Sequence, residues 1–250
     1  MTRKQRELIE REDLILQAAH DLLLERGYHG LTMERIAKAI EYSKGTIYQH
    51  FRCKEEVISA LASRYLEKQL AMTERAASYE GRTRERIAAI GEGLEIFIRL
   101  HPDEVRILQI IKSETVSEKA SEECQAAMKA VEFQAMATVA AIVHAAVLDG
   151  DLELAPDTPP EAVSFGLWAI VSGGHANILR DLPFQEVRIG DPYAVTMNTC
   201  DILLDGYGWR PLSTEWDYAR TRERARWTLF AKEARRLCGE ECPVRAAEAR

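Results

Sequence analysis

The segment from residue 32 to residue 55 constrains this chain most, because it has the pattern of two short helices joined by a tight turn. Thr32 is placed to cap the first helix, since its hydroxyl can accept a hydrogen bond from a free backbone N–H group. Ile36 and Ile40 then fall on one face at helical spacing. The pattern breaks after them, and Ser43 is placed to cap a second short helix. The segment therefore predicts a helix-turn-helix.

The second helix has an unusual composition for a helix whose only role is structural. Gly45 near its start costs roughly 1 kcal/mol relative to alanine, but it leaves room for a DNA backbone. Ile47 and Phe51, four residues apart, are expected to face inward. The outward side chains offer a cation, hydroxyls and an amide, which bind phosphates and base edges. We expect DNA contacts from Thr32, Ser43, Lys44, Gly45, Thr46, Tyr48, Gln49, His50 and Lys54. Spacing alone leaves open an ordinary helical hairpin with a solvated polar face.

Five stretches around this segment carry a family resemblance: Ile15–Ala19, Glu25–Tyr28, Leu31–Ala37, Ser43–Phe51 and Lys54–Val57. Together, over residues 10–66, they resemble the DNA-binding domain of the tetracycline-repressor (TetR) family. Two departures are small. Tyr42 stands where the family usually has a small apolar residue, and Cys53 stands where Ser, Asn or Asp is common. Neither departure affects the expected fold.

The resemblance implies a transcription regulator that acts as a homodimer. Two recognition helices about 34 Å apart match two half-sites one DNA turn apart. We therefore expect a repressor that binds a palindromic double-stranded DNA operator. An effector bound in the C-terminal domain would change the separation or tilt of the two recognition helices and so release the operator.

The rest of the chain is helical in pattern, and no stretch alternates at period two for long enough to indicate a sheet. We predict an all-α fold, with an N-terminal three-helix helix-turn-helix domain and a C-terminal helical domain for ligand binding and dimerisation. The predicted domains are residues 1–55, connected by helix 54–73, then residues 74–212, and an extra helix and tail at 213–250. Helices are expected at 7–26, 54–73, 84–100, 105–112, 117–148, 161–180 and 192–205.

Helices 161–180 and 192–205 are the expected dimer interface. Gly173 and Gly174 lower the stability of the first helix but permit close backbone approach. This part of the chain also resembles the C-terminal domain of the same family, although that domain is far more variable. The alternative is that both helices fill the core of a monomer.

The resemblance also places a small-molecule effector inside the C-terminal domain. Aromatic side chains with a few polar groups suit a small apolar or amphipathic ligand. The expected lining residues are Phe97, His101, Ile111, Met128, Phe133, His144, Phe165, Trp168 and His175. Ordinary core packing is the alternative for each of these residues.

The net charge of the chain is −7, from 33 Lys and Arg against 40 Asp and Glu, which is unusual for a protein that binds DNA. The charge is unevenly distributed, because residues 1–54 carry a small excess of basic residues and the remainder is acidic. A modest positive patch on an acidic body fits specific, salt-sensitive binding. It argues against a nonspecific DNA coat.

Targeting signals are not apparent in the sequence. The first residues are polar and charged, without the apolar core of a signal peptide. No run of 18 apolar residues indicates a membrane span. The five scattered cysteines do not suggest a disulfide framework. We therefore expect a cytoplasmic protein with reduced thiols and no membrane partner.

Residues 213–250 extend beyond the usual end of the family. Their apolar residues Trp227, Phe230, Ala234 and Leu237 fall at helical spacing and are surrounded by arginines. An extra helix that caps the core or the dimer is the first interpretation. A basic surface for DNA or for a partner is the second.

A metal- or thiol-responsive DNA-binding sensor is the alternative function. Cys238 and Cys242, four residues apart, would lie on one face of a helix, but two thiols fall short of a zinc site. His101, His144 and His175 lie on different expected helices and would need to converge, with Glu104 or Glu114, to hold a metal. We predict no bound metal and no cofactor.

An enzyme, or a scaffold that merely retains the DNA-binding domain, is the remaining class. The sequence shows no nucleophile motif and no glycine-rich phosphate loop. We therefore expect no enzymatic activity.

Overall fold

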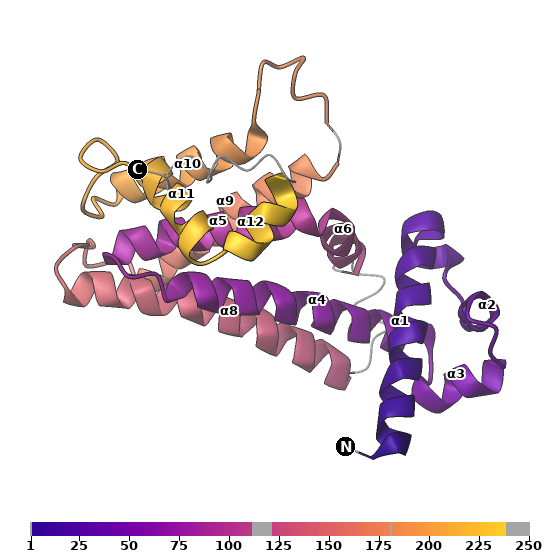
Figure 1. Ribbon diagram of the computed structural model, residues 1–250. Helices are drawn as coiled ribbons and strands as arrows, with labels where there is room; N and C mark the ends of the chain where they lie inside the picture. Colours follow the sequence, from indigo (N-terminus) through magenta and orange to yellow (C-terminus); the bar gives the residue numbers. More distant parts are fainter. Residues whose placement is uncertain (1, 112–121, 181, 239–250) are drawn as a thin grey trace, which may run out of the picture. The chain divides into compact units, whose positions relative to one another are not determined.

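The computed structural model describes residues 2–111, 122–180 and 182–238, and within these ranges every regular element is an α-helix (Figure 1). The predicted all-α class is therefore confirmed. The chain divides into two compact units, one formed by residues 1–68 with 103–132 and the other by residues 69–102 with 133–250. The division falls inside two long helices, α4 (Lys54–Ala77) and α8 (Glu122–Leu148).

The first unit begins with α1 (Arg3–Gly30), which is longer than the expected 7–26. Thr2 and Gln5 form a capping box at its start, so the helix begins several residues earlier than the apolar stripe indicates. Gly27 was expected to end the helix. Instead it has a φ of 65° and marks a kink within α1. The α2 (Met33–Ala39), α3 (Lys44–His50) and α6 (Pro102–Ile111) helices complete this unit together with parts of α4 and α8.

One hydrophobic core joins all these helices of the first unit. Its fully buried members include Ile15 of α1, Ile36 of α2, Ile47 of α3 and Ile58 of α4. Three residues of α6 belong to the same core: Ile107, Leu108 and Ile111. The unit that contains the helix-turn-helix is thus larger than residues 1–55, because a helix far along the chain supplies part of its core.

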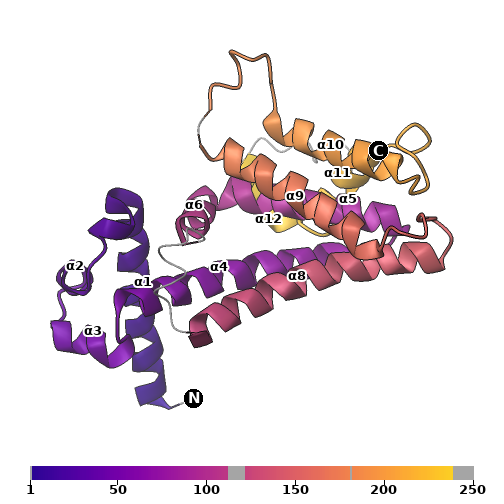
Figure 2. The same cartoon turned by 180° about the vertical axis from the view of Figure 1, so that it is seen from behind.

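The second unit is organised around α5 (Thr83–Leu100), most of which is buried. The α11 (Tyr218–Thr228) and α12 (Ala231–Cys238) helices pack against α5, and α9 (Pro160–Ile178) packs against α10 (Pro192–Gly206) (Figures 1 and 2). Gly174 of α9 lies so close to Thr196 of α10 that an added Cβ would come within 2.6 Å of the threonine hydroxyl. The expected close approach at Gly174 is therefore made within one chain.

Residues 213–238 form two helices of the second unit rather than one. Phe230, between α11 and α12, is fully buried and packs on the backbone of Gly93 in α5. The guanidinium of Arg75 lies 4.5 Å from the centroid of the Phe230 ring and forms a 2.6 Å ion pair with Glu233. These contacts favour the interpretation that the extension covers the core.

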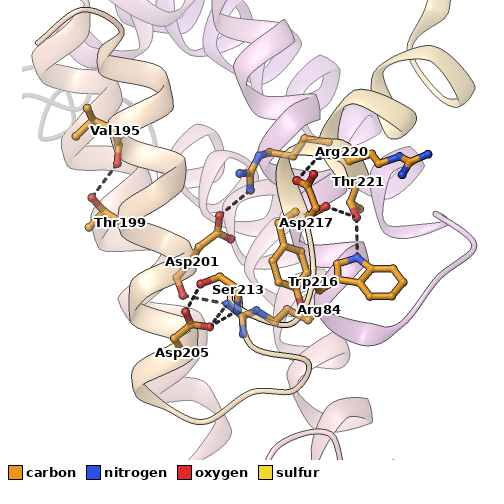
Figure 3. A network of polar contacts seen from close by, with 12 residues as sticks. Arg84, Val195, Thr199, Asp201, Asp205, Ser213, Trp216, Asp217, Arg220 and Thr221 are labelled. Atoms are coloured by element: carbon orange, nitrogen blue, oxygen red, sulfur yellow. Dashed lines mark hydrogen bonds and ion pairs between the residues drawn. The ribbon is translucent and has the colours of Figure 1, made fainter.

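A buried arginine connects three distant parts of the second unit (Figure 3). Arg84 of α5 is only 1% exposed. It donates hydrogen bonds to the carbonyl oxygens of Trp209 at 2.5 Å, Pro211 at 2.9 Å and Asp201 at 3.0 Å, and forms a 2.6 Å ion pair with Asp205. The segment that follows α10 is thereby attached to the start of α5.

The expected ends of several other helices shift in the structure. The expected helix 105–112 begins earlier, at Pro102 of α6, a position where proline is tolerated because its missing N–H would be unpaired there. The first residues of the expected helix 117–148 lie outside the described ranges, and α8 is described from Glu122.

One helix differs from the expectation of no membrane span. Residues 125–148 of α8 are long and apolar enough to cross a membrane by length and composition, although Lys129 and Glu132 interrupt any continuous apolar run. A single helix of this kind is weak evidence, because length and composition do not distinguish it from helices of soluble proteins.

Candidate nucleic-acid interface

Both short helices of the helix-turn-helix begin at the expected caps. The Thr32 hydroxyl accepts a hydrogen bond from the backbone N–H of Arg35 at 3.2 Å, and the Ser43 hydroxyl accepts one from Thr46 at 3.1 Å. Between the helices, Glu41 has a φ of 56°, the left-handed conformation that reverses the chain direction. These local contacts hold α2 and α3 as a compact pair.

The inner side of α3 determines which residues face outward. Ile47 is fully buried and Phe51, which follows the helix, is almost fully buried. The side chains of Lys44, Tyr48 and Gln49 are exposed as a result. A cation, a phenol and an amide therefore stand together on the open face of a rigidly anchored helix, and they supply donors and acceptors for phosphates and base edges.

Several of the other residues predicted to contact DNA are engaged in helix caps or are only partly exposed. Thr46 is half-buried, and its hydroxyl lies 2.8 Å from that of Ser43, so both hydroxyls are engaged in the cap. Thr32 is engaged in the cap of α2. Gly45 is exposed with open space around the position of a Cβ, and His50 is half-exposed at the end of α3.

Lys44 has a partner that the sequence did not indicate. Its ammonium group forms an ion pair with the carboxylate of Glu34 in α2 and lies 5.6 Å from the centroid of the Tyr48 ring. The hydrogen bond from Lys44 lowers the pKa of Glu34, and the same bond raises the pKa of Lys44. Both side chains are more than half exposed, so another anion has access to Lys44.

Lys54 is directed toward α1. Its Nζ donates a 3.1 Å hydrogen bond to the carbonyl of Tyr28 and lies 3.9 Å from the centroid of the Tyr28 ring. The Tyr28 hydroxyl donates to Glu55 at 2.9 Å, and burial, followed by this hydrogen bond, raises the pKa of Tyr28 to about 12. Lys54 thus attaches the start of α4 to the end of α1.

Comparison with known proteins supports this geometry. The family described as "Bacterial regulatory proteins, tetR family" matches residues 15–61, which contain the whole helix-turn-helix. Residues 15–61 therefore form a DNA-binding domain of the TetR-family type.

Curated relatives match the TetR-family domain and little beyond it. The HTH-type transcriptional activator FasR of Mycolicibacterium smegmatis is 33% identical over 89 residues, which cover 36% of this chain and 41% of FasR. The HTH-type transcriptional regulator UidR of Escherichia coli is 40% identical over 57 residues, 23% of this chain and 29% of UidR. The chain therefore spans less than half the length of these relatives.

The likeness to solved structures extends over most of the fold. FadR from Bacillus subtilis, solved in complex with stearoyl-CoA, is 16% identical with a TM-score of 0.59, over 77% of this chain and 97% of that chain. At this identity the likeness shows that the two chains share a fold.

The predicted effector residues do not gather around one described cavity. Ile111 and Met128 pack with the core of the first unit, whereas the other seven belong to the second. The structure brings two pairs together. The rings of Phe97 and His101 have centroids 5.1 Å apart, and those of Phe165 and Trp168 are 5.8 Å apart.

Most of the remaining predicted effector residues lie on the surface of the second unit. Phe133 is 73% exposed. His144 is exposed and hydrogen-bonded to Glu161 at 2.9 Å. His175 is the exception, because it is buried in α9 beside Tyr193, with ring centroids 6.4 Å apart.

Acid is expected to destabilise the second unit through His175. Burial lowers the pKa of this imidazole from 6.5 to about 4, so below pH 6.5 the unfolded chain binds a proton that the folded chain excludes. The free energy of unfolding should fall by about 3 kcal/mol between pH 6.5 and pH 4 from this group. Urea unfolding across this range should show a shallower pH slope for His175→Phe. An identical slope in both chains would contradict the assignment.

No cluster of three or more His, Cys, Asp or Glu side chains suitable for a metal occurs among the described residues. Cys238 is exposed at the end of α12, and its predicted partner Cys242 lies outside the described residues, as does Glu114. The three histidines do not converge: His101 lies beside Phe97, His144 beside Glu161 and His175 beside Tyr193.

Proposed function

We propose that this chain is a homodimeric transcriptional repressor that binds a palindromic operator and is released by a small apolar or amphipathic effector. The exposed side chains of Lys44, Tyr48 and Gln49 on α3 carry the proposal. They stand on a helix anchored by Ile47 in a TetR-family domain. A bacterial regulator of this kind acts where the DNA is, in the cytoplasm.

Apolar side chains on α9 and α10 support the homodimer. Phe165, Trp168, Val195 and Ile202 are between 48% and 61% exposed, although apolar side chains of this size favour burial. A second copy of the same two helices would cover them in a symmetric four-helix contact. The predicted interface 161–180 and 192–205 thus retains unpaired apolar surface after the two helices have packed on each other.

Release by a ligand requires that the ligand bind one conformational state more tightly than the other. The stearoyl-CoA held by FadR is an amphipathic molecule, which supports an effector of that class for this chain. The alternative sensor that uses Cys238 and Cys242 or the histidines gains no supporting contact from the described residues.

Binding to the DNA upstream of the chain's own gene tests the proposal directly. Fluorescence anisotropy at low salt and without ligand should show a sequence-specific complex that competes poorly with unrelated DNA. A complete lack of sequence preference would reject the proposed function. Because FasR is an activator, transcription from the bound promoter should also be measured. If the protein is a repressor, this transcription should rise when the protein is removed.

Removing the charge of Glu34 should strengthen DNA binding. In Glu34→Gln, Lys44 no longer has a carboxylate partner, and one negative charge leaves the surface that would meet the phosphates. We expect about a threefold to tenfold gain in affinity, because each copy in the proposed dimer frees one cation and loses one negative charge beside the phosphates. Anisotropy should show the gain shrinking as salt rises. Unchanged or weaker binding at low salt would show that DNA does not compete with Glu34 for Lys44.

A further inference from the structure

The second unit contains a pocket that none of the predicted effector residues lines. Its volume is about 640 Å³, and it lies between the end of α5, the start of α10 and the helices α11 and α12. The lining residues are Glu95, Ile98, Arg99, Pro102, Asp191, Tyr193, Arg226 and Leu237. The C-terminal extension therefore contributes part of the wall.

Two arginines face each other across the carboxylate of Glu95. The Nε of Arg99 donates to Glu95 at 2.8 Å, and Nη2 of Arg226 lies 3.8 Å from the same carboxylate oxygen. The Nε of Arg226 donates to the buried carboxylate of Glu92 at 2.5 Å. Both guanidinium groups are thus fixed in place through their Nε atoms.

The outer nitrogens of these guanidinium groups are largely uncommitted. Among the described residues, Nη1 of Arg99 and both Nη atoms of Arg226 make no hydrogen bond within 3.5 Å. Nη2 of Arg99 makes only a long contact, 3.4 Å, to the half-exposed carboxylate of Asp191. Donors held in place but poorly paired can form strong, charge-assisted hydrogen bonds to an anion.

The rest of the wall is apolar or aromatic. Pro102 and Leu237 supply aliphatic surface, whereas Ile98 is almost completely buried behind it. The ring of Tyr193 lies under the guanidinium of Arg99, with 4.1 Å between the carbon of that group and the ring centroid. The exposed lining is more polar than apolar, so two fixed arginines beside a smaller apolar part suit a small organic anion rather than a purely apolar molecule.

We propose that this pocket binds a small amphipathic anion, with Arg99 and Arg226 holding the anionic group and Pro102 and Leu237 covering the apolar part. The anion replaces Asp191 at Arg99, because this is the longest hydrogen bond made by either arginine and Asp191 is the most exposed of their carboxylate partners. Asp191 stays in place as the cap of α10 through its other oxygen, which accepts from the N–H of Tyr193 at 2.9 Å. The site is independent of DNA binding.

Isothermal titration calorimetry of the full chain with phenylacetate, its neutral analogue phenylacetamide and inorganic phosphate tests the site. Phenylacetate should bind more tightly than either of the others, because it alone has both the anion and the apolar group. Arg99→Gln should weaken phenylacetate binding about tenfold through the lost charge-assisted hydrogen bond. Arg99 is chosen because replacing Arg226 would leave the buried carboxylate of Glu92 without its partner.

The Asp191→Asn variant should have the opposite effect on phenylacetate affinity. Asparagine keeps an oxygen that can cap α10 but removes the charge that competes for Arg99, so phenylacetate should bind about threefold to tenfold more tightly. Arg224→Gln, an exposed residue of α11 outside the pocket, should change nothing. Thermal unfolding confirms that each variant is folded.

No detectable phenylacetate binding would overturn the proposal, as would binding that is the same in Arg99→Gln and Asp191→Asn as in the original chain. Phosphate binding as tight as that of phenylacetate would overturn the amphipathic class, because the apolar wall would then contribute nothing. All these titrations are made without DNA, so a failure of the proposed operator binding would leave their result unaffected.

Discussion

Replacing Arg84 by methionine is expected to lower the free energy of unfolding of the second unit by about 3–5 kcal/mol, as when a buried charge network is broken. Three carbonyl oxygens, those of Asp201, Trp209 and Pro211, lose their donor, and two of these bonds are fully buried. Each unpaired buried carbonyl costs about 1–3 kcal/mol. Asp205 is partly exposed, so water can replace its partner and limit the loss.

Urea unfolding followed by tryptophan fluorescence measures this effect, since Trp209 is completely buried beside the network. Arg84→Lys should be intermediate, because an ammonium group keeps the charge but lacks the planar fork that reaches several acceptors. Arg224→Met, at an exposed position, should stay within about 0.5 kcal/mol. A midpoint for Arg84→Met equal to that of the unaltered chain would show that the network does not stabilise the fold.

Replacing Lys44 by alanine is expected to weaken operator binding about 10- to 100-fold at low salt, since each copy in the proposed dimer loses one phosphate contact. The dependence of affinity on salt should also become less steep, with the slope of log affinity against log salt falling by about 2 for the two contacts. Anisotropy titrations at several salt concentrations supply both quantities. Lys44 is exposed and outside the core, so the stability of the domain should not change.

A double-mutant cycle with Glu34→Gln separates a direct role of Lys44 from a general effect of charge. If Lys44 contacts phosphate, the gain expected from Glu34→Gln should shrink in the Lys44→Ala background, because the freed cation is no longer there. Arg224→Ala provides a control for the loss of a positive charge far along the chain. Equal losses of affinity for Lys44→Ala and Arg224→Ala would contradict the assignment of α3 as the DNA-reading helix.

The helix-turn-helix was readable from sequence because its determinants are local. Thr32 and Ser43 cap helices through bonds that reach three residues along the chain, and Ile47 and Phe51 are separated by one helical turn. Contacts of this range leave a periodic pattern in the sequence. The ion pair of Lys44 left no such pattern, because its partner Glu34 lies ten residues away on another helix.

The contacts within the C-terminal unit were much harder to predict from the sequence. Its helices were expected in nearly the right places, yet the nine predicted effector residues are divided between two units and only form local pairs. Helical periodicity predicts that an apolar side chain such as Phe97 or Ile111 faces inward. The same periodicity does not specify which neighbouring helix that side chain contacts. The sequence did not indicate that Arg99 and Arg226 line a pocket, because an arginine in a polar stretch has the same pattern whether it is exposed or buried.

The sequence by itself determined the helical class, the two short helices of the DNA-binding domain and their outward face. These follow from caps, turns and 3.6-residue periodicity, which act over a few residues. Only the tertiary structure decided that α6 completes the first core, that Arg84 binds the segment after α10, and that Arg99 and Arg226 meet at one pocket. These contacts join residues of different helices, 125 positions apart for Arg84 and Trp209, and they depend on how helices pack, a relation that no local pattern encodes.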